Sequence, residues 1–254
     1  MRRSTRWSRW AVGALGVAFA YVAYIYLTVP DVRVLASANP ESTAFIELRR
    51  DEAHVAGRSF RPRRRWVPYG RISNHLKRAV IVAEDSAFFE HEGLDYDQIR
   101  ASIESSLEDG SAVRGASTIT QQLAKNLYLS PSRNPMRKVR ELIITRRLEA
   151  ALTKRRIFEI YLNSIEWGDG IFGCDAAARA YFGKSAADLG AGEAALLAGA
   201  IINPRVHNPA KPTRRLLRRQ QLILRRMGAV DPPADVPATI PAAAAPPSTV
   251  PPPP

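Results

Sequence analysis

Cysteine is almost missing from this chain, and histidine is scarce. Cys174 is the single cysteine among 254 residues, so no internal disulfide can form. The four histidines are scattered without the spacing of a zinc site, which argues against a Cys/His metal centre. A regular alternation of helix and strand patterns is lacking too. That absence disfavours a doubly wound parallel sheet and indicates a mainly α fold class.

Acidic residues are also few compared with basic ones. Lys and Arg number 37 against 24 Asp and Glu, which gives a formal net charge of +13. Such a surplus attracts nucleic acid, anionic lipid headgroups or phosphorylated substrates, and composition alone does not choose between them.

One long uncharged run, residues 10–29, approaches the ~20 residues that cross a bilayer as a helix. The positive-inside rule places the basic segment 1–9 in the cytoplasm and the rest of the chain outside, where lipid-linked phosphates are expected and nucleic acid is not. The alternative is a signal peptide cleaved near Ala36-Ser37-Ala38, but the run exceeds the ~7–15 residues of a signal core. The arginines of the basic segment are Arg2, Arg3, Arg6 and Arg9.

The chain divides by composition into a connector, a helical domain and a tail. Residues 30–70 form the connector, with one expected strand over 43–48 and a basic loop over 61–65. Residues 71–228 carry helical periodicity, and residues 229–254 are a Pro/Ala-rich tail expected to be disordered. Helices are predicted over 97–107, 134–153, 159–163, 176–182, 192–202 and 214–227.

Glu84 ends an apolar helical stretch, Ala79–Ala83, and is followed by Asp85. A carboxylate at the rim of a core is partly buried, which raises its pKa and suits it to act as a general base. The competing interpretation is an acid at a helix end that only caps the helix or pairs with an arginine.

A polar segment follows about thirty residues later. Ser117, Gln121 and Lys125 recur every four residues and are expected on one helical face, with Ile119, Leu123 and Leu127 buried on the other. The Ser/Thr-rich N-terminus of such a helix is a natural anion site. An ordinary amphipathic helix with a capping serine explains the same pattern.

Further cations follow at Arg133, Arg137 and Lys138, with Glu141 one turn beyond Arg137. One interpretation is a solvated surface ion pair. The other is a phosphate clamp that steadies a departing pyrophosphate, with Glu141 orienting the cations or binding a divalent metal ion. The later basic run 154–156 is interpreted as a structural helix junction.

Taken in order, these segments resemble the peptidoglycan glycosyltransferase (transglycosylase) family, and in particular its monofunctional members. The likeness spans about residues 42–227. Two departures are Cys174-Asp175, where a small residue and Glu are expected, and the Pro-rich tail. The matching stretches are Glu84-Asp85…Phe88…His91…Gly93, Gly115–Gln122 with Lys125-Asn126, Arg137-Lys138…Glu141, Tyr161–Asn163, Trp167–Gly173 through Tyr181–Lys184, and Arg218-Arg219.

The resemblance implies a lysozyme-like, two-lobe helical domain behind a single transmembrane helix. It implies Glu84 as the catalytic base, Glu141 as a second essential carboxylate, and Mg²⁺ or Mn²⁺ as a helper bound by Glu141, with no nucleotide cofactor. It assigns the substrate phosphates to Lys125, Arg133, Arg137 and Lys138, and the lining of the cleft to Ser117, Gln121 and Gln122.

The implied reaction transfers disaccharide-peptide units from lipid II to a glycan strand, with inversion and release of undecaprenyl pyrophosphate. Cross-linking is not expected, because no Ser-x-x-Lys or Lys-Thr-Gly of a penicillin-binding domain follows. The implied location is the cell inner membrane, single-pass, with the catalytic domain in the periplasm. Implied partners are lipid II, the nascent glycan, the membrane, and cell-wall synthesis or division proteins.

Two rival hypotheses use the same features. A lytic, lysozyme-like enzyme also needs one glutamic acid, but cleavage of neutral glycan needs no basic clamp at 125–138. An anchored scaffold without catalysis would use the basic surface and the tail to recruit partners.

Overall fold

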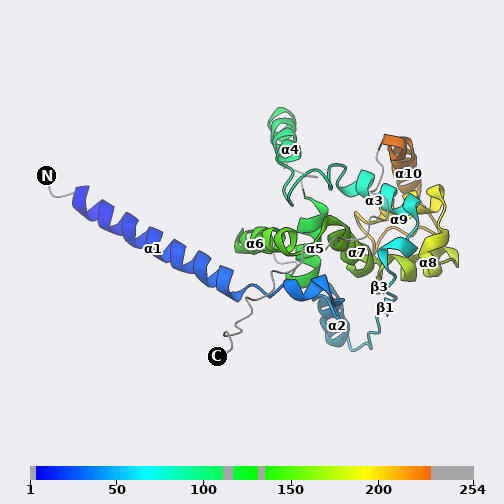
Figure 1. Ribbon diagram of the computed structural model, residues 1–254, viewed down its shortest axis with the longest axis horizontal. Coiled ribbons are helices and arrows are strands. Elements are labelled where there is room, and N and C mark those ends of the chain that lie inside the picture. Colours follow the sequence, from blue (N-terminus) through cyan, green and yellow to red (C-terminus); the bar gives the residue numbers. More distant parts are fainter. Residues whose placement is uncertain (1–3, 111–116, 131–134, 230–254) are drawn as a thin grey trace, which may run out of the picture.

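Helices make up most of the structure, a computed structural model that describes residues 4–110, 117–130 and 135–229 (Figure 1). The mainly α prediction is confirmed. The helices are α1 (Ser4–Thr28), α2 (Ala44–Val55), α3 (Asn74–Glu84), α4 (Tyr96–Asp109), α5 (Ile119–Tyr128), α6 (Pro135–Ala151), α7 (Lys154–Ser164), α8 (Cys174–Phe182), α9 (Ala191–Ala200) and α10 (Arg214–Arg226). Short 3-10 helices are η1 (Arg33–Ala36), η2 (Tyr69–Arg71), η3 (Ala186–Asp188) and η4 (Met227–Ala229).

A small sheet accompanies the helices. It has the order β1-β3-β2, with β1 (Arg63–Arg64) parallel and β2 (Glu166–Gly168) antiparallel to the central β3 (Ile171–Phe172). The basic loop predicted over 61–65 therefore contains an edge strand.

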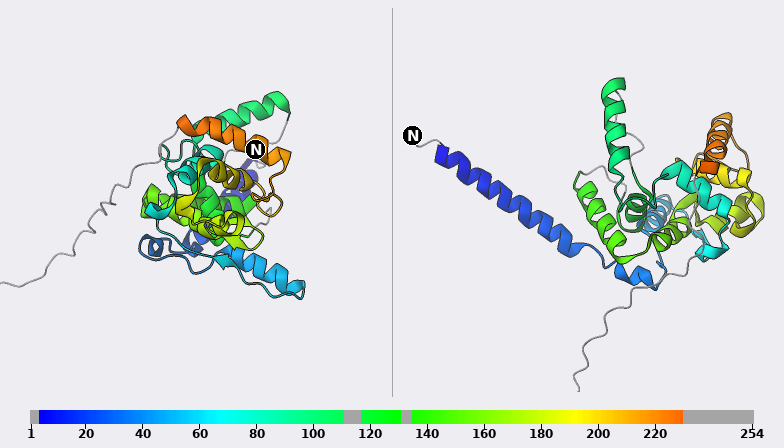
Figure 2. Two further views of the ribbon diagram at one scale, coloured as in Figure 1. Left: turned by 90° about the vertical axis from the view of Figure 1, so that its right-hand side faces the viewer. Right: turned by 45° about the horizontal axis from the view of Figure 1, so that its top comes forward.

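Helix α1 extends away from the rest of the molecule (Figure 2). Within the described residues it is the one helix long and apolar enough to cross a membrane, in agreement with the predicted span 10–29. Its C-terminal end is held by α6, because Arg140 donates to the Thr28 hydroxyl at 3.1 Å and Arg147 to the Val29 carbonyl at 3.1 Å. The body of the protein thus begins where the apolar helix ends.

The strand predicted over 43–48 is wrong, because this segment starts α2. The Thr43 hydroxyl accepts a hydrogen bond from the Ile46 N–H at 3.1 Å and caps the helix. Ile46 and Ala53 are buried, and α2 packs on α5. A β-branched threonine that looked like part of a strand is instead the helix cap, a position that favours hydroxyl side chains.

Two groups of helices meet at the centre of the body. Helix α5 packs against α2, α6 and α7, while α3 packs against α9 and α10. Phe88, which follows α3, packs on Phe158 of α7 with ring centroids 5.5 Å apart. The Ile119 N–H at the start of α5 donates to Asp85 at 2.9 Å, so the end of α3, where Glu84 lies, is beside α5.

Helix α4 projects from this body, as both views of Figure 2 show. It confirms the helix predicted over 97–107, and Gly110 ends it with a left-handed φ of 62°. Tyr96 and Leu107 are exposed on it. Gly115 and Ala116 lie outside the described residues.

We expect Thr118→Ala to destabilise the fold by about 2 kcal/mol, at the upper end of the range for lost helix caps. The buried Thr118 hydroxyl accepts from the Gln121 N–H at 3.2 Å and donates to the Gly93 carbonyl at 2.8 Å, so both contacts are lost. Thr153 caps α7 from an exposed position, and Thr153→Ala is the control, with an expected loss of about 1 kcal/mol. Urea unfolding measures both, and equal losses would contradict the prediction.

Candidate active site

Glu84 is the last residue of α3, and its side chain is 12% exposed. The Gln122 side-chain amide of α5 donates to Glu84 Oε2 at 2.9 Å. The Tyr161 hydroxyl of α7 donates to the oxygen of the same amide at 2.8 Å, which orients the Gln122 nitrogen toward the carboxylate. Residues from three helices therefore position this carboxylate.

Burial and the neighbouring groups shift the pKa of Glu84 in opposite directions. Burial raises the pKa of Glu84, as the sequence predicted, while the Gln122 hydrogen bond and the charges of Arg219 and Lys125 lower it. Arg219 Nη2 lies 3.5 Å from Glu84 Oε1. This oxygen is buried and accepts no hydrogen bond from the described residues.

Asp85 has a structural role. Its buried carboxylate accepts from the Ile119 N–H at 2.9 Å, the first residue of α5, and from His91 Nε2 at 3.0 Å. The Gly93 N–H donates to His91 Nδ1 at 3.1 Å, so the proton of the neutral ring lies on Nε2. Gly93 has a φ of 82°, and a Cβ there would lie 2.8 Å from Thr145 Cγ2 of α6, so both conformation and space favour glycine.

The start of α5 differs from its predicted form. Ser117 is exposed and precedes the helix, whose cap is Thr118. The buried Gln121 accepts from the Thr118 N–H at 3.0 Å in a capping box, so its amide faces its own helix. Ser117, Gln121 and Lys125 therefore do not form one exposed face, and the anion bound at this helix N-terminus is Asp85.

The opposite face of α5 agrees with the prediction. Ile119, Leu123 and Leu127 are buried in the core. Helix α5 is enclosed on several sides, and Gln122 and Lys125 remain partly exposed.

A cluster of cations on α5 and α6 surrounds Glu141. Glu141 is 4% exposed and accepts hydrogen bonds from Arg137 Nη1 at 2.8 Å and from Lys138 Nζ. Burial lowers the pKa of Lys125, the charge of Glu141 raises it, and Arg137 and Lys138 lower it. The structure thus brings together Lys125, Arg137, Lys138 and Glu141, whereas Arg133 lies outside the described residues.

A cavity of about 230 Å³ lies between α2, α5 and the segment that follows α9. Gln122, Lys125 and Tyr161 contribute to its wall, together with Arg49, Glu166 and Arg205. Arg49 Nη2 pairs with Glu166 Oε2 at 2.7 Å. The amide that holds Glu84 and the lysine that faces Glu141 therefore border one space.

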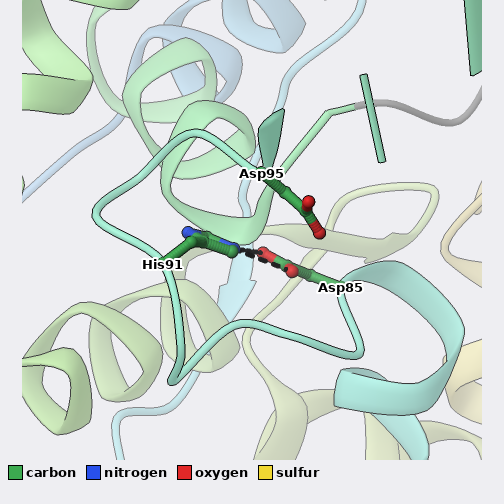
Figure 3. A group of neighbouring side chains, drawn as sticks. All are labelled: Asp85, His91 and Asp95. Atoms are coloured by element: carbon green, nitrogen blue, oxygen red, sulfur yellow. Dashed lines mark hydrogen bonds and ion pairs between the residues drawn. The ribbon is translucent and has the colours of Figure 1, made fainter. Parts of the chain in front are cut away.

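A group that could hold a metal ion lies elsewhere, at Asp85, His91 and Asp95 (Figure 3). Their ligand atoms are within 4.8 Å of one another. Asp85 and His91 already bond to each other, and Asp95 Oδ1 accepts from the Gln98 N–H at 2.8 Å as the cap of α4. The predicted metal ligand, Glu141, is bonded to two cations, and this donor set does not fit a dication.

Arg219 belongs to the matching stretch Arg218-Arg219, but the sequence did not predict its contact with Glu84. Only the packing of α10 on α3 brings it beside Glu84. Tyr161 belonged to a matching motif, but its bond to Gln122 was not foreseen. The 154–156 run is a structural junction as predicted, since Arg156 donates to the carbonyls of Leu35 and Ala38 at 2.7 and 2.8 Å.

Comparison with known proteins gives consistent results. Residues 51–228 match the Transglycosylase family. The chain is 50% identical over 192 residues to the biosynthetic peptidoglycan transglycosylase of Laribacter hongkongensis, covering 76% of this chain and 84% of the relative. That of Janthinobacterium sp. strain Marseille is 51% identical over 191 residues, 75% and 83% of the two chains. That of Thiobacillus denitrificans is 44% identical over 234 residues, 92% of this chain and 100% of the relative.

The electrostatic balance at Glu84 leads to a prediction. We expect Arg219→Gln to raise the pKa of Glu84 further, because a cation that favours the charged carboxylate is removed. NMR titration of a ¹³C-labelled glutamate side chain measures the shift. Arg218→Gln, an exposed neighbour on the same helix, is the control and should leave the titration in place. A lowered pKa in Arg219→Gln would contradict the arrangement.

Proposed function

The chain belongs to the peptidoglycan transglycosylase family of glycosyltransferases, and from that premise we propose that it polymerises glycan strands from lipid II. One observation carries the proposal. The amide of Gln122, which donates to the shielded carboxylate of Glu84, borders the same cavity as Lys125. A base next to a cavity that also holds a cation suits an alcohol attack that expels an anion.

Glu84 acts as the general base in this proposal. It accepts the proton of the acceptor sugar 4-hydroxyl through Oε1, the oxygen that accepts no hydrogen bond from the described chain. The acceptor oxygen bonds to the anomeric carbon as the bond to the diphosphate oxygen breaks, and attack from the opposite face inverts that carbon. Burial makes Glu84 a stronger base, while Gln122 and Arg219 favour its ionised form.

The departing undecaprenyl pyrophosphate is stabilised by Lys125, Arg137 and Lys138, with Arg133 proposed as a further contact. A diphosphate has a low proton affinity, so positive charge serves it better than a general acid. Glu141 holds Arg137 and Lys138 together as the second essential carboxylate. Of the residues proposed to line the cleft, Gln122 has the contact that supports this role, and Ser117 and Gln121 remain proposals.

The lipid-linked substrate also explains the anchor. Helix α6, which carries Arg137 and Lys138, binds the end of α1 through Arg140 and Arg147. We place α1 in the cell inner membrane with its N-terminus in the cytoplasm and the catalytic domain in the periplasm. Cell-wall synthesis or division proteins are the proposed partners, and no transpeptidase activity is expected.

Replacement of the base is the first test. We expect Glu84→Gln to lower the rate of lipid II polymerisation at least about 100-fold, because no group remains to accept the hydroxyl proton. Glu90→Gln, an exposed carboxylate six positions along, is the control and should keep the wild-type rate. Gel analysis of labelled glycan from full-length protein in detergent measures both. Retained activity in Glu84→Gln points to another base, and cleavage of preformed peptidoglycan without polymerisation points to a lytic enzyme.

Substitution of Glu141 distinguishes two roles for this carboxylate, holding Arg137 and Lys138 or binding a metal ion. We expect Glu141→Gln to lower kcat/KM for lipid II about tenfold or more, because Arg137 and Lys138 lose their shared acceptor. The Mg²⁺ or Mn²⁺ concentration that gives half-maximal rate should stay the same. A shift of that midpoint to higher concentration would make Glu141 a metal ligand, as the sequence first predicted.

A further inference from the structure

A second, strongly basic cavity lies beside the first. It has a volume of about 210 Å³, and the described residues around it include five arginines and two carboxylates. Neither the proposed base nor the proposed phosphate clamp belongs to it. These charged residues are Arg49, Arg58, Arg61, Arg63, Arg205, Glu52 and Asp169.

Two of the arginines already neutralise the carboxylates. Glu52 accepts from Arg49 Nη1 at 3.0 Å and from Arg205 Nη1 at 3.4 Å, and Asp169 accepts from Arg205 Nε at 3.2 Å. Arg58, Arg61 and Arg63 have no ion pair among the described residues, and all three are exposed. The cavity therefore presents three guanidinium groups that lack an anion.

The backbone that carries Arg58 and Arg63 is held in place. The Arg58 N–H donates to the Ala53 carbonyl at 2.8 Å, and Gly57 makes the turn after α2 with a φ of 65°. The Arg63 N–H donates to the Gly170 carbonyl at 2.9 Å, and β1 pairs with β3. An ordered backbone lowers the entropy cost of gathering the three side chains around one ligand.

The position of this cavity decides what kind of anion it suits. Arg49 and Arg205 border both cavities, so the two cavities are neighbours, and Lys125 borders only the first. Lys125 lies toward α6, the helix that binds the end of α1. The loop between α2 and β1 lies on the side of the body away from α1 (Figure 1). Lipid-linked phosphates are thus expected beside Lys125, and the second cavity is suited to a different anion.

We propose that this second cavity binds a carboxylate of the peptide attached to the glycan while the sugar occupies the first cavity. The proposal rests on the proposed function, since it assigns a further part of that substrate. Guanidinium groups bind carboxylates through paired hydrogen bonds, and several around one cavity select for a charged peptide end over a neutral one.

The test compares two substrates in the full-length protein. One lipid II carries its peptide with a free C-terminal carboxylate, and the other has that carboxylate converted to the amide. We expect the wild type to have a kcat/KM about three to ten times higher for the carboxylate form, the range for a few exposed ion pairs. The triple variant Arg58→Gln/Arg61→Gln/Arg63→Gln should lose this preference and keep the wild-type rate on the amide.

A matched control removes the same charge elsewhere. Arg215→Gln/Arg225→Gln/Arg226→Gln changes three exposed arginines of α10 and should keep the preference. Turnover of neither substrate by the wild type would refute the proposed function itself. Equal turnover of both would refute only the peptide site.

A direct measurement covers the alternative that these arginines bind lipid headgroups. A fluorescent, acetylated peptide with a free C-terminus should bind the wild type more tightly than its amide, and the triple variant should bind both equally. If the triple variant instead loses binding to vesicles containing anionic lipid, while its substrate preference stays unchanged, the cavity faces a membrane and the proposal is overturned.

Discussion

The bond from the Ile119 N–H to the Asp85 carboxylate is the contact on which the site depends. Asp85 directly follows α3 and Ile119 begins α5, so this bond joins the helix that carries Glu84 to the helix that carries Gln122. His91 binds the same carboxylate, and Gly93 binds His91 and Thr118. Because Asp85 is buried, loss of its carboxylate side chain would leave these donors without an acceptor in the core, a costly state.

Charges of opposite sign alternate from this junction outward. Glu84 faces Arg219 and Lys125, and Lys125 in turn is influenced by Glu141. Glu141 is surrounded by Arg137 and Lys138. Glu84 is only partly paired, since Arg219 Nη2 is 3.5 Å from Oε1 and this oxygen accepts no hydrogen bond from the described residues. The proposed role of Glu84 as a base requires that it can take up a proton, which partial pairing allows.

The sequence was informative where local spacing decides the structure. The apolar stretch Ala79–Ala83 predicted a helix that ends at Glu84, and α3 ends there. Local spacing failed at Thr43, whose hydroxyl caps α2 instead of extending a strand. Local spacing also could not predict the contact between Arg219 and Glu84, because this contact depends on how α10 packs across α3. The carboxylates of the site could be found from the chain, but their partners come from tertiary packing.

The attachment of α6 to α1 relates the chemistry to the membrane. Arg140 and Arg147 bind the last turn of α1 and the residue after it, while Arg137 and Lys138 of the same helix surround Glu141. A helix rises about 1.5 Å per residue, so the two sets of cations lie within about three turns of each other. If α1 spans the bilayer, the cation cluster is held close to its surface. A phosphate that remains linked to a lipid cannot move far from that surface, and a cation cluster at this height meets it without lifting the lipid out of the membrane.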